Sequence, residues 1–410
     1  MGARRILFLT QWFDPEPAAL KGLAFVKALK DQGFEIEVAT GFPNYPTGRI
    51  ASGYKLRPYT LHLMEGIKVH RLYLYPSHDT SSLGRALNFL SFFISALIFC
   101  LVHGGRYDAI YVYHPPITVG LAATLAGYIT HTPFVLDIQD LWPDSVAASG
   151  MSGTGWLAKM LAPMCSLVYR RAAAIVPQSA GMKTRLVERG VPSSKMTTIY
   201  NWADENSAAP SGTLDLAGYS FKDRFNFVFA GNLGRFQGLE TLVHAAQIAE
   251  TKMPNIHLTL IGDGVERDKL ARLLKMLDNK SVSIRPSVPR SSIGDVLDAA
   301  DVLLIHLDSD PLFEITIPGK TQFYLAMGKP ILIGVRGEAA QIVTDAGAGI
   351  SVAPRDAEAM AAAMLQMAKM PPDILALMGR CGRKAYERRF SFATGIEATK
   401  KVLSSVATTK

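Results

Sequence analysis

Short apolar runs rich in β-branched residues alternate with helical patterns along almost all of the 410 residues. The predicted strands of the first half cover residues 6–10, 35–40, 68–73, 109–113, 134–138, 174–177 and 197–200. A polar, irregular stretch follows, and the later predicted strands cover 226–230, 257–261, 282–285, 302–306, 330–334 and 350–352. Alternation of this kind is typical of βαβ units around a parallel sheet, so we predict an α/β protein.

Two such series predict two Rossmann-like domains that face each other across a cleft. We expect a first domain at 1–202, a linker at 203–224, a second domain at 225–385, and a C-terminal helix at 386–410 that packs back on the first domain. Ligands of open α/β sheets bind beyond the carboxyl ends of the strands. The loops that follow the strands are therefore the places to look for functional residues.

The charge balance favours an anionic partner. Lys and Arg number 43 against 35 Asp and Glu, a net charge of +8, which suits nucleic acid, an anionic membrane or a phosphorylated small molecule. The chain has no long Lys/Arg run, which disfavours nucleic acid. Its three cysteines lie far apart without disulfide or metal spacing, and no secretory signal opens the chain, so we expect a cytoplasmic protein.

Residues 86–102 (ALNFLSFFISALIFCLV) are uncharged over 17 positions. A spanning helix needs about 20 apolar residues, so a true span is disfavoured. A core helix of an α/β domain and an interfacial helix both remain open. We predict peripheral attachment to a membrane through the first domain, without a spanning segment.

Loops of the first half carry polar groups at strand ends. Gly22 opens a helix after the first strand, where backbone N–H groups favour an anion, although a plain helix start explains it equally well. The rigid loop after the second strand displays Asn44, Tyr45 and Arg49, groups that suit a sugar or phosphate or a structural turn. His114 ends the fourth predicted strand, and Asp140 with a Trp-Pro pair follows the fifth.

Loops of the second half suit a diphosphate. Gly231 and Asn232 follow a strand and lead to Arg235 at a helix start, where a cation and backbone amides favour a phosphate. Glu314 and Lys320 precede another helix, where they are placed for a sugar hydroxyl and a phosphate. The Asp308-Ser309-Asp310 triplet is interpreted as a loop, and we expect no metal.

Five segments in collinear order resemble glycosyltransferase family 4, most closely its WbuB-like branch: TGFPNYPTGRI, DLWPDS, FAGNLGRFQGLETL, IGDGVERDKL and PLFEITIPGKTQFYLAMGKPIL. The resemblance implies a GT-B fold and retaining transfer from a nucleotide sugar without a metal or cofactor. It further implies a UDP-hexosamine-type donor and a polyprenyl-diphosphate-linked acceptor in O-antigen, capsule or exopolysaccharide synthesis, at the inner face of the cell membrane.

The resemblance carries over unevenly to single residues. Family members hold the donor diphosphate with an Arg and a Lys; Arg235 matches the first and Gln237 stands at the second, so Lys320 is expected to supply that cation. Glu314 lies near the first of two family glutamates, and Phe323 stands at the second. The expected donor residues are thus Gly22, Gly231, Asn232, Gln237, Arg285, Glu314 and Glu338. The expected acceptor residues are Asn44, Tyr45, Arg49 and His114, and the expected catalytic residues are Asp140, Arg235 and Lys320.

Two other functions remain open at this stage. A nucleotide-sugar epimerase on the same paired architecture would turn over its substrate without an acceptor. A non-catalytic nucleotide-sugar-binding protein would account for Phe323 and Gln237 at family positions usually held by Glu and Lys.

Overall fold

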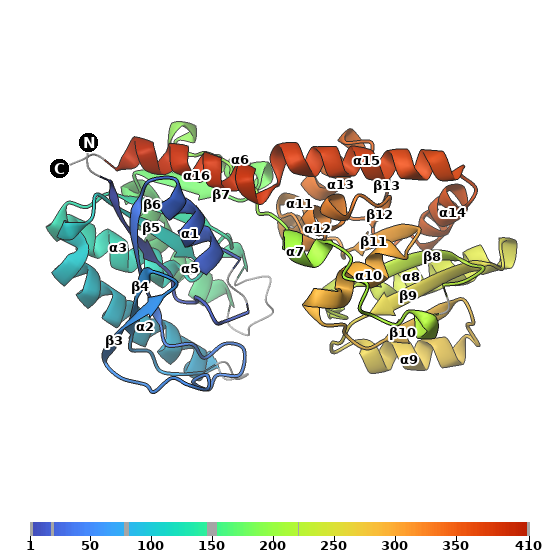
Figure 1. Cartoon of the computed structure of the whole chain (residues 1–410), viewed down its shortest axis with the longest axis horizontal. Helices are drawn as coiled ribbons and strands as arrows, with labels where there is room; N and C mark the ends of the chain where they lie inside the picture. The colour runs from blue at the N-terminus through green and yellow to red at the C-terminus, as the bar shows by residue number, and fades with distance from the viewer. Residues whose placement is uncertain (1–2, 18–19, 78–81, 146–153, 220, 408–410) are drawn as a thin grey trace. The chain divides into compact units, whose positions relative to one another are not determined.

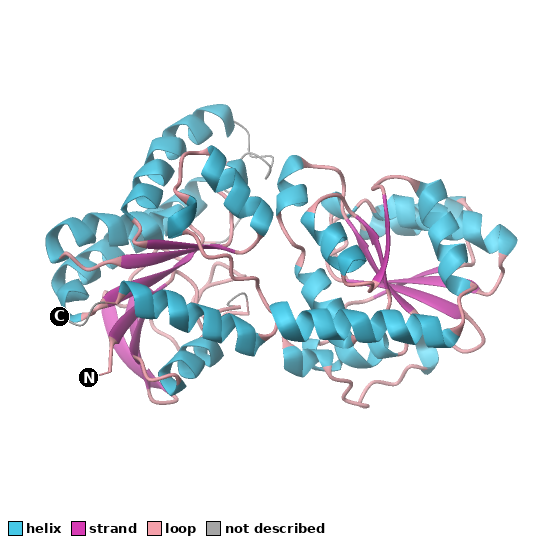
Figure 2. Ribbon diagram, turned by 90° about the horizontal axis from the view of Figure 1, so that it is seen from above, coloured by secondary structure: helices cyan, strands magenta, loops and turns pink. Residues whose placement is uncertain are grey.

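The computed structural model describes residues 3–17, 20–77, 82–145, 154–219 and 221–407 (Figure 1). The chain forms two compact units, one from Met1–Ile199 with Gly395–Lys410 and the other from Tyr200–Thr394. In each unit the strands lie between helices, as Figure 2 shows. The last helix, α16 (Phe392–Val406), contributes to the first unit, where Lys400 Nζ donates to Gln32 Oε1 at 2.9 Å.

The first unit contains a seven-stranded sheet in the order β3-β4-β2-β1-β5-β6-β7. Its strands are β1 (Arg5–Leu9), β2 (Glu35–Gly41), β3 (Tyr59–Met64), β4 (Ile67–Leu72), β5 (Ala109–His114), β6 (Phe134–Ile138) and β7 (Ala174–Pro177). All pairs are parallel except β3 with β4. Its helices are α1 (Leu23–Asp31), α2 (Ser82–His103), α3 (Ile117–Thr130), α5 (Thr154–Arg171) and α6 (Ala180–Glu188). Every residue of β5 and β6 is buried, as expected of parallel strands covered on both faces.

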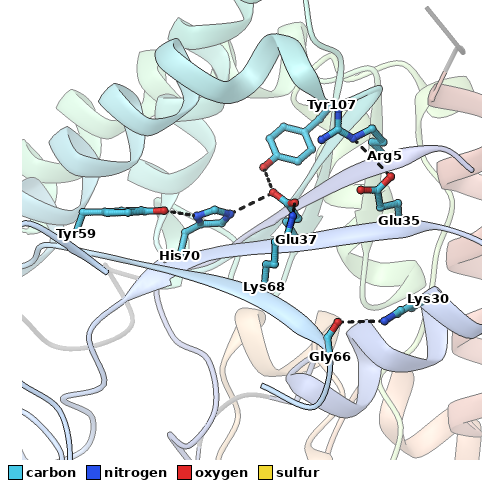
Figure 3. Close-up of polar contacts among 9 residues, drawn as sticks. All are labelled: Arg5, Lys30, Glu35, Glu37, Tyr59, Gly66, Lys68, His70 and Tyr107. Atoms are coloured by element: carbon cyan, nitrogen blue, oxygen red, sulfur yellow. Dashed lines mark hydrogen bonds and ion pairs between the residues drawn. The ribbon is translucent and has the colours of Figure 1, made fainter. Parts of the chain in front are cut away.

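The edge of this sheet is fastened by one carboxylate, Glu37 of β2 (Figure 3). It accepts hydrogen bonds from Tyr107 Oη at 2.6 Å, Lys68 Nζ at 3.0 Å and His70 Nε2 at 3.2 Å. Because His70 donates through Nε2, its Nδ1 accepts from Tyr59 Oη at 2.9 Å, which links β3 to the inner strands. Burial alone raises the pKa of Glu37, but these three donors outweigh it and lower the pKa to about 2.

Helix α2 has one buried and one exposed side. Asn88, Phe92, Ala96, Phe99 and Cys100 are buried at helical spacing. Six large apolar side chains form an exposed stripe, each 41–69% exposed: Leu83, Leu87, Leu90, Ile94, Ile98 and Val102. Among the described residues, the single stretch long and apolar enough to cross a membrane is Leu83–Arg106; its most apolar 18-residue window has a mean hydropathy of 2.1, and 28% of that window is buried. The helix is therefore not a core helix covered on all sides.

The second unit contains a six-stranded parallel sheet in the order β10-β9-β8-β11-β12-β13. Its strands are β8 (Phe225–Ala230), β9 (Ile256–Ile261), β10 (Val282–Arg285), β11 (Val302–His306), β12 (Ile331–Gly334) and β13 (Gly349–Val352). Its helices are α7 (Glu205–Ala208), α8 (Leu239–Lys252), α9 (Arg267–Met276), α10 (Ile293–Asp298), α11 (Pro311–Ile315), α12 (Gly319–Met327), α13 (Glu338–Asp345), α14 (Ala357–Ala368) and α15 (Pro372–Arg389). Alternate strand residues supply two cores, since Phe227 and Phe229 pack with α8 and α14 whereas Val228 packs with α10 and α12.

The polar stretch predicted as a linker lies within the second unit. Asp295 of α10 accepts hydrogen bonds from the backbone N–H groups of Ser211, Gly212, Thr213 and Leu214. These hydrogen bonds lower the pKa of Asp295 to about 2, and the bond from the Gly212 N–H has the largest effect. The chain crosses between the units at Ile199–Tyr200 and again at Thr394–Gly395.

Candidate functional site

Two glycines bring the ends of β8 and β9 together in the second unit. Gly231 and Gly262 have φ of 139° and 146°, a region that favours glycine. A Cβ on Gly262 would lie 1.8 Å from the carbonyl oxygen of Gly231, and the Gly231 N–H donates to Ile261 O at 2.8 Å. No side chain fits between the two turns, so the backbone itself forms this strand edge.

Lys320 lies directly against this turn. Its Cε would be 2.8 Å from a Cβ on Gly231, its ammonium lies 4.4 Å from the centre of the Phe229 ring, and Nζ donates to Gln237 Oε1 at 3.0 Å. Burial lowers the pKa of Lys320 to about 8. The structure thus brings together three residues that the sequence analysis assigned to the donor site, namely Gly231, Gln237 and Lys320.

The same place is the N-terminus of α12. Pro318 precedes the helix and provides no side-chain cap, and the Thr321 N–H donates to the Pro318 carbonyl oxygen at 2.8 Å. The N–H groups of Gly319 and Lys320 are therefore the amides that this helix terminus offers to an anion. Thr321, in the first turn, is fully buried, and its hydroxyl has no partner within the described part of the chain. A half-buried lysine, two helix amides and a hydroxyl together suit a phosphate group.

Arg235 lies apart from Lys320 in the structure. Its side chain is 81% exposed, and Nε lies 3.8 Å from the Glu266 carboxylate. Asn232 is exposed as well, with its side chain beside Gly234. Both residues are on the loop after β8, and the sequence prediction of their role stays a prediction.

Glu314 lies in the short helix α11, and Glu338 is the first residue of α13. Gly337, just before α13, has φ of 84°, and a Cβ there would lie 2.1 Å from the Glu314 carbonyl oxygen, so the start of α13 touches α11 through backbone. The Glu314 side chain is exposed, whereas Glu338 Oε1 accepts from Tyr200 Oη at 3.1 Å. Beside them is an open depression of about 390 Å³ lined by Val335, Arg336, Gly337, Ala340, Gln341, Thr344, Ser351, Val352 and Ala353.

Arg285 is farther from this group. It ends β10, the edge strand, which is separated from β8 by β9, and its guanidinium lies 5.7 Å from the centre of the Tyr219 ring. Arg285 lies at the carboxyl end of its strand, where a donor-binding residue is expected. The structure places it two strands away from the Gly231 turn that Lys320 contacts.

His306 is a buried residue that the sequence analysis did not select. Its Nδ1 donates to the Gln237 carbonyl at 2.7 Å, and its Nε2 accepts from the Arg355 N–H at 3.3 Å. Arg355 holds Asp308 through two hydrogen bonds of 2.9 and 2.8 Å. His306 thus fixes the loop that carries Gln237, and the only sequence signal was its place at a strand end.

No group of three or more His, Cys, Asp or Glu side chains able to hold a metal occurs among the described residues. The Asp308 carboxylate, the first of the Asp-Ser-Asp triplet, is paired with Arg355.

In the first unit, Asn44 and Tyr45 are held by a buried carboxylate. Both backbone N–H groups donate to Glu16 Oε1, at 2.8 and 2.9 Å, and the Phe13 N–H donates to Glu16 Oε2 at 3.1 Å. Burial raises the pKa of Glu16, and this effect exceeds the lowering by the three backbone N–H donors. Glu16, which was not selected from the sequence, therefore positions the loop after β2 relative to the loop after β1.

The other predicted residues of this unit lie at or near the same sheet edge. His114, the last residue of β5, is fully buried, and Asp140 is exposed just after β6. Arg49 is exposed on the loop after β2. Gly22 precedes α1, whose first N–H, on Leu23, donates to Asp14 Oδ2 at 2.6 Å, so a carboxylate of the chain already occupies that helix terminus.

A buried ion pair was also missed. Lys21 Nζ and Tyr111 Oη both donate to Asp137 Oδ2, and Gln139 Nε2 donates to Asp137 Oδ1 at 2.6 Å. Lys21 and Asp137 are both fully buried. Because they join the loop after β1 to the end of β6, they position the start of the loop that carries Asp140, the predicted catalytic carboxylate.

Comparison with known proteins covers both units. Residues 23–202 match the model of the glycosyl transferase 4-like domain, and residues 224–370 match that of the glycosyl transferases group 1. The chain is 24% identical over 290 residues to probable glycosyltransferase WbjE of Pseudomonas aeruginosa, covering 69% of this chain and 70% of the relative. It is 25% identical over 365 residues to the putative colanic acid biosynthesis glycosyl transferase WcaI of Escherichia coli K12, covering 84% of this chain and 87% of that relative.

The fold is shared with solved structures. That of Anabaena Alr3699/HepE in complex with UDP superposes with a TM-score of 0.72 at 18% identity, covering 98% of this chain and 100% of that one. At this identity the likeness concerns the fold.

Proposed function

The chain belongs to glycosyltransferase family 4 and has its two Rossmann-like GT-B units, and on that premise we propose that it transfers a hexosamine-type sugar from a UDP donor to a polyprenyl-diphosphate-linked glycan. The reaction serves cell-surface polysaccharide synthesis, which the likeness to the putative colanic acid biosynthesis glycosyl transferase WcaI supports. The observation that carries the proposal is Lys320, a half-buried cation placed between the Gly231 turn and the uncapped start of α12.

The donor diphosphate binds in the second unit, at this phosphate receptor. An ammonium whose pKa is lowered by burial gains most from an arriving anion, because the anion replaces the solvation that burial removed. The Anabaena protein has been solved with UDP and with UDP-glucose, which supports a nucleotide-sugar donor on this fold. Arg235 reaches the diphosphate from the exposed loop after β8 by a change of side-chain rotamer.

The chemistry needs stabilisation of a departing diphosphate. The bond between the anomeric carbon and the diphosphate oxygen breaks while the acceptor hydroxyl bonds to the same face of that carbon, and the hydroxyl proton passes to the leaving diphosphate. Lys320, Arg235 and the α12 amides stabilise the charge that develops on the leaving group. Asp140 orients the acceptor hydroxyl, and the protein cations make a metal unnecessary.

The acceptor keeps its lipid in a membrane, and the protein attaches to that membrane peripherally at the cytoplasmic face. Two exposed apolar surfaces support this attachment. The stripe on α2 runs for about 28 Å at 1.5 Å per residue and contains no acidic residue, while Arg85 and Arg106 lie near its ends. Such an arrangement fits a bilayer that carries negative charge.

Strand β3 adds to this surface. Leu61 lies opposite His70 in the antiparallel pair, so both side chains point to the same side of the sheet. The His70 ring packs on Phe99 of α2 with 4.8 Å between centroids. Tyr59, Leu61 and Leu63, all exposed, therefore lie on the α2 side of the sheet and extend the apolar surface.

A thermal-shift screen of nucleotides and nucleotide sugars tests the donor site. We expect UDP and UDP-sugars to raise the melting temperature of the wild type by mass action and to leave Lys320→Ala unshifted. A wild type that responds to no nucleotide, or a Lys320→Ala variant that responds as the wild type does, contradicts the proposal.

Flotation with anionic vesicles tests the membrane surface. We expect the wild type to float and Leu90→Glu plus Ile94→Glu to stay in solution. The matched control is Val265→Glu plus Met276→Glu, which adds the same charge at two apolar residues of the second unit that are more exposed than Leu90 and Ile94, and it should float. A wild type that never floats ends the membrane proposal without affecting the donor site.

A further inference from the structure

Four half-buried aromatic rings form a continuous row in the first unit. They come from four separate segments: Trp12 after β1, Tyr45 after β2, Phe89 on α2 and Trp142 after β6. The centroid distances are 6.0 Å for Tyr45–Trp12, 6.4 Å for Trp12–Phe89 and 6.4 Å for Phe89–Trp142. We call these four rings the aromatic row.

The protein holds the aromatic row in place from behind. The Trp142 carbonyl accepts hydrogen bonds from Arg189 Nη1 at 3.0 Å and from Tyr169 Oη at 3.2 Å. Gln11, beside Trp12 in the chain, donates to Asn88 Oδ1 at 2.5 Å, and Asn88 is beside Phe89. The rings are therefore ordered before any ligand arrives, which lowers the entropic cost of binding one.

Two polar side chains directly behind the aromatic row are not satisfied. Gln11 Oε1 and both ring nitrogens of His114 are buried and have no hydrogen-bond partner in the part of the chain that the structure describes. His114 lies 6.3 Å from Trp142 between ring centroids. Burial lowers its pKa to about 3, so the neutral imidazole presents one donor and one acceptor. Buried polar groups without partners are rare and call for a reason.

A sugar ring suits this combination better than a lipid chain does. The electron-rich faces of aromatic rings attract the polarised C–H groups of a sugar face, while sugar hydroxyls supply both donors and acceptors to Gln11 and His114. The lipid has its own surface on the exposed side of α2, where Leu90 follows Phe89 directly. One helix thus serves both parts of a lipid-linked glycan.

We infer that the aromatic row is the binding platform for the acceptor glycan, with neutral sugar rings stacked on Trp12, Phe89 and Trp142 and their hydroxyls bonded to Gln11 and His114. This inference rests on the proposed transfer to a lipid-linked glycan and deepens it. Rotation of the Trp142 ring gives the hydroxyls access to His114. The predicted acceptor residue Tyr45 belongs to the aromatic row, and Trp12, Phe89 and Trp142 are additions to the predicted acceptor set.

Saturation-transfer NMR tests the platform without requiring turnover. The probe is decyl diphosphate carrying a single hexose, in gluco and galacto forms, and the aromatic protons of the protein are irradiated. We expect saturation on the sugar-ring protons in the wild type, reduced by at least half in Trp142→Leu and in Phe89→Leu. The matched control is Tyr128→Leu, an exposed aromatic residue on α3 that is outside the aromatic row and should leave the signal unchanged.

Steady-state kinetics and calorimetry separate this inference from the proposed function. Both row variants should raise the acceptor KM at least fivefold and keep the UDP affinity within twofold of the wild type. Saturation confined to the decyl chain, or unchanged sugar signals in both variants while UDP still binds, overturns the platform alone. A wild type that binds neither UDP nor the probe refutes both proposals.

Discussion

The half-buried ammonium of Lys320 predicts that donor binding depends on pH. Its pKa in the free protein is about 8, against an ordinary 10.5. An arriving diphosphate stabilises the protonated amine and raises that pKa, so the wild type binds best below pH 8. Above pH 8 the affinity should fall by about tenfold per pH unit, or about 1.4 kcal/mol, until the pKa of the complex is reached.

Isothermal titration calorimetry with UDP-N-acetylglucosamine measures this effect, because its esterified phosphates do not titrate near neutral pH. Between pH 7 and pH 9 the protonated fraction of a group with a pKa of 8 falls roughly tenfold, so we expect a similar loss of affinity. At pH 8 binding should take up about half a proton, read from the dependence of the enthalpy on buffer ionisation.

Lys320→Arg is the control, because its guanidinium stays charged throughout this range. We expect a binding constant independent of pH and no proton uptake. Lys320→Ala should bind weakly at every pH. A wild-type affinity that is equal at pH 7 and pH 9, or proton uptake that persists in Lys320→Arg, refutes the argument that this ammonium receives the diphosphate.

Three further predictions concern catalysis, metal dependence and stability. Arg235→Ala should lower kcat/KM by about a hundred- to a thousandfold, because removing one donor to the developing charge typically costs about 2.7–4 kcal/mol, and a folded variant with wild-type activity would remove Arg235 from the mechanism. EDTA should leave transfer rates unchanged, whereas an obligatory Mg²⁺ or Mn²⁺ requirement would count against metal-free transfer. Glu37→Gln should lower the free energy of unfolding by about 1–2 kcal/mol at pH 7 after solvent screening. Because the folded pKa lies below the unfolded one, urea titrations should show that difference shrinking as pH falls from about 4.5 towards 2, and a constant difference would contradict it.

The buried parallel strands could be predicted from the sequence because they are short apolar runs that alternate with helices. The edge strand β3 was missed. Its residues alternate between exposed and half-buried positions, and its exposed members are the apolar residues Tyr59, Leu61 and Leu63. A pattern in which apolar side chains point to solvent resembles an ordinary loop until tertiary structure supplies β4 as a partner.

The site could be predicted where its residues follow strands directly. Gly231 and Gln237 were selected from the segment after β8, and Lys320 from a segment 83 positions beyond Gln237, and the structure places them within contact distance. Thr321 and His306 were not selected, because a buried hydroxyl and a strand-end histidine have ordinary structural explanations. Their significance comes from distances between loops, which sequence spacing does not contain.

Residues that position loops were the least predictable. Glu16 and Asp137 act through partners 28 to 116 positions away, namely Asn44 and Lys21. Whether α2 is covered on all sides was also open, because its 17 uncharged residues fit a core helix as well as an interfacial one. Only the arrangement of its neighbours decides which side of the helix is covered.

Transfer of a labelled sugar tests the central claim most directly. The purified protein would be incubated in EDTA with a radiolabelled UDP-hexosamine and a polyprenyl-diphosphate-linked glycan in anionic vesicles, and the lipid fraction then extracted and counted. We predict label in the lipid fraction that requires the acceptor and is lost in Lys320→Ala. The assay would be repeated with several UDP-hexosamines and several lipid-linked glycans. If every combination leaves the UDP-sugar unchanged or epimerised, with no label in the lipid fraction, the account is contradicted.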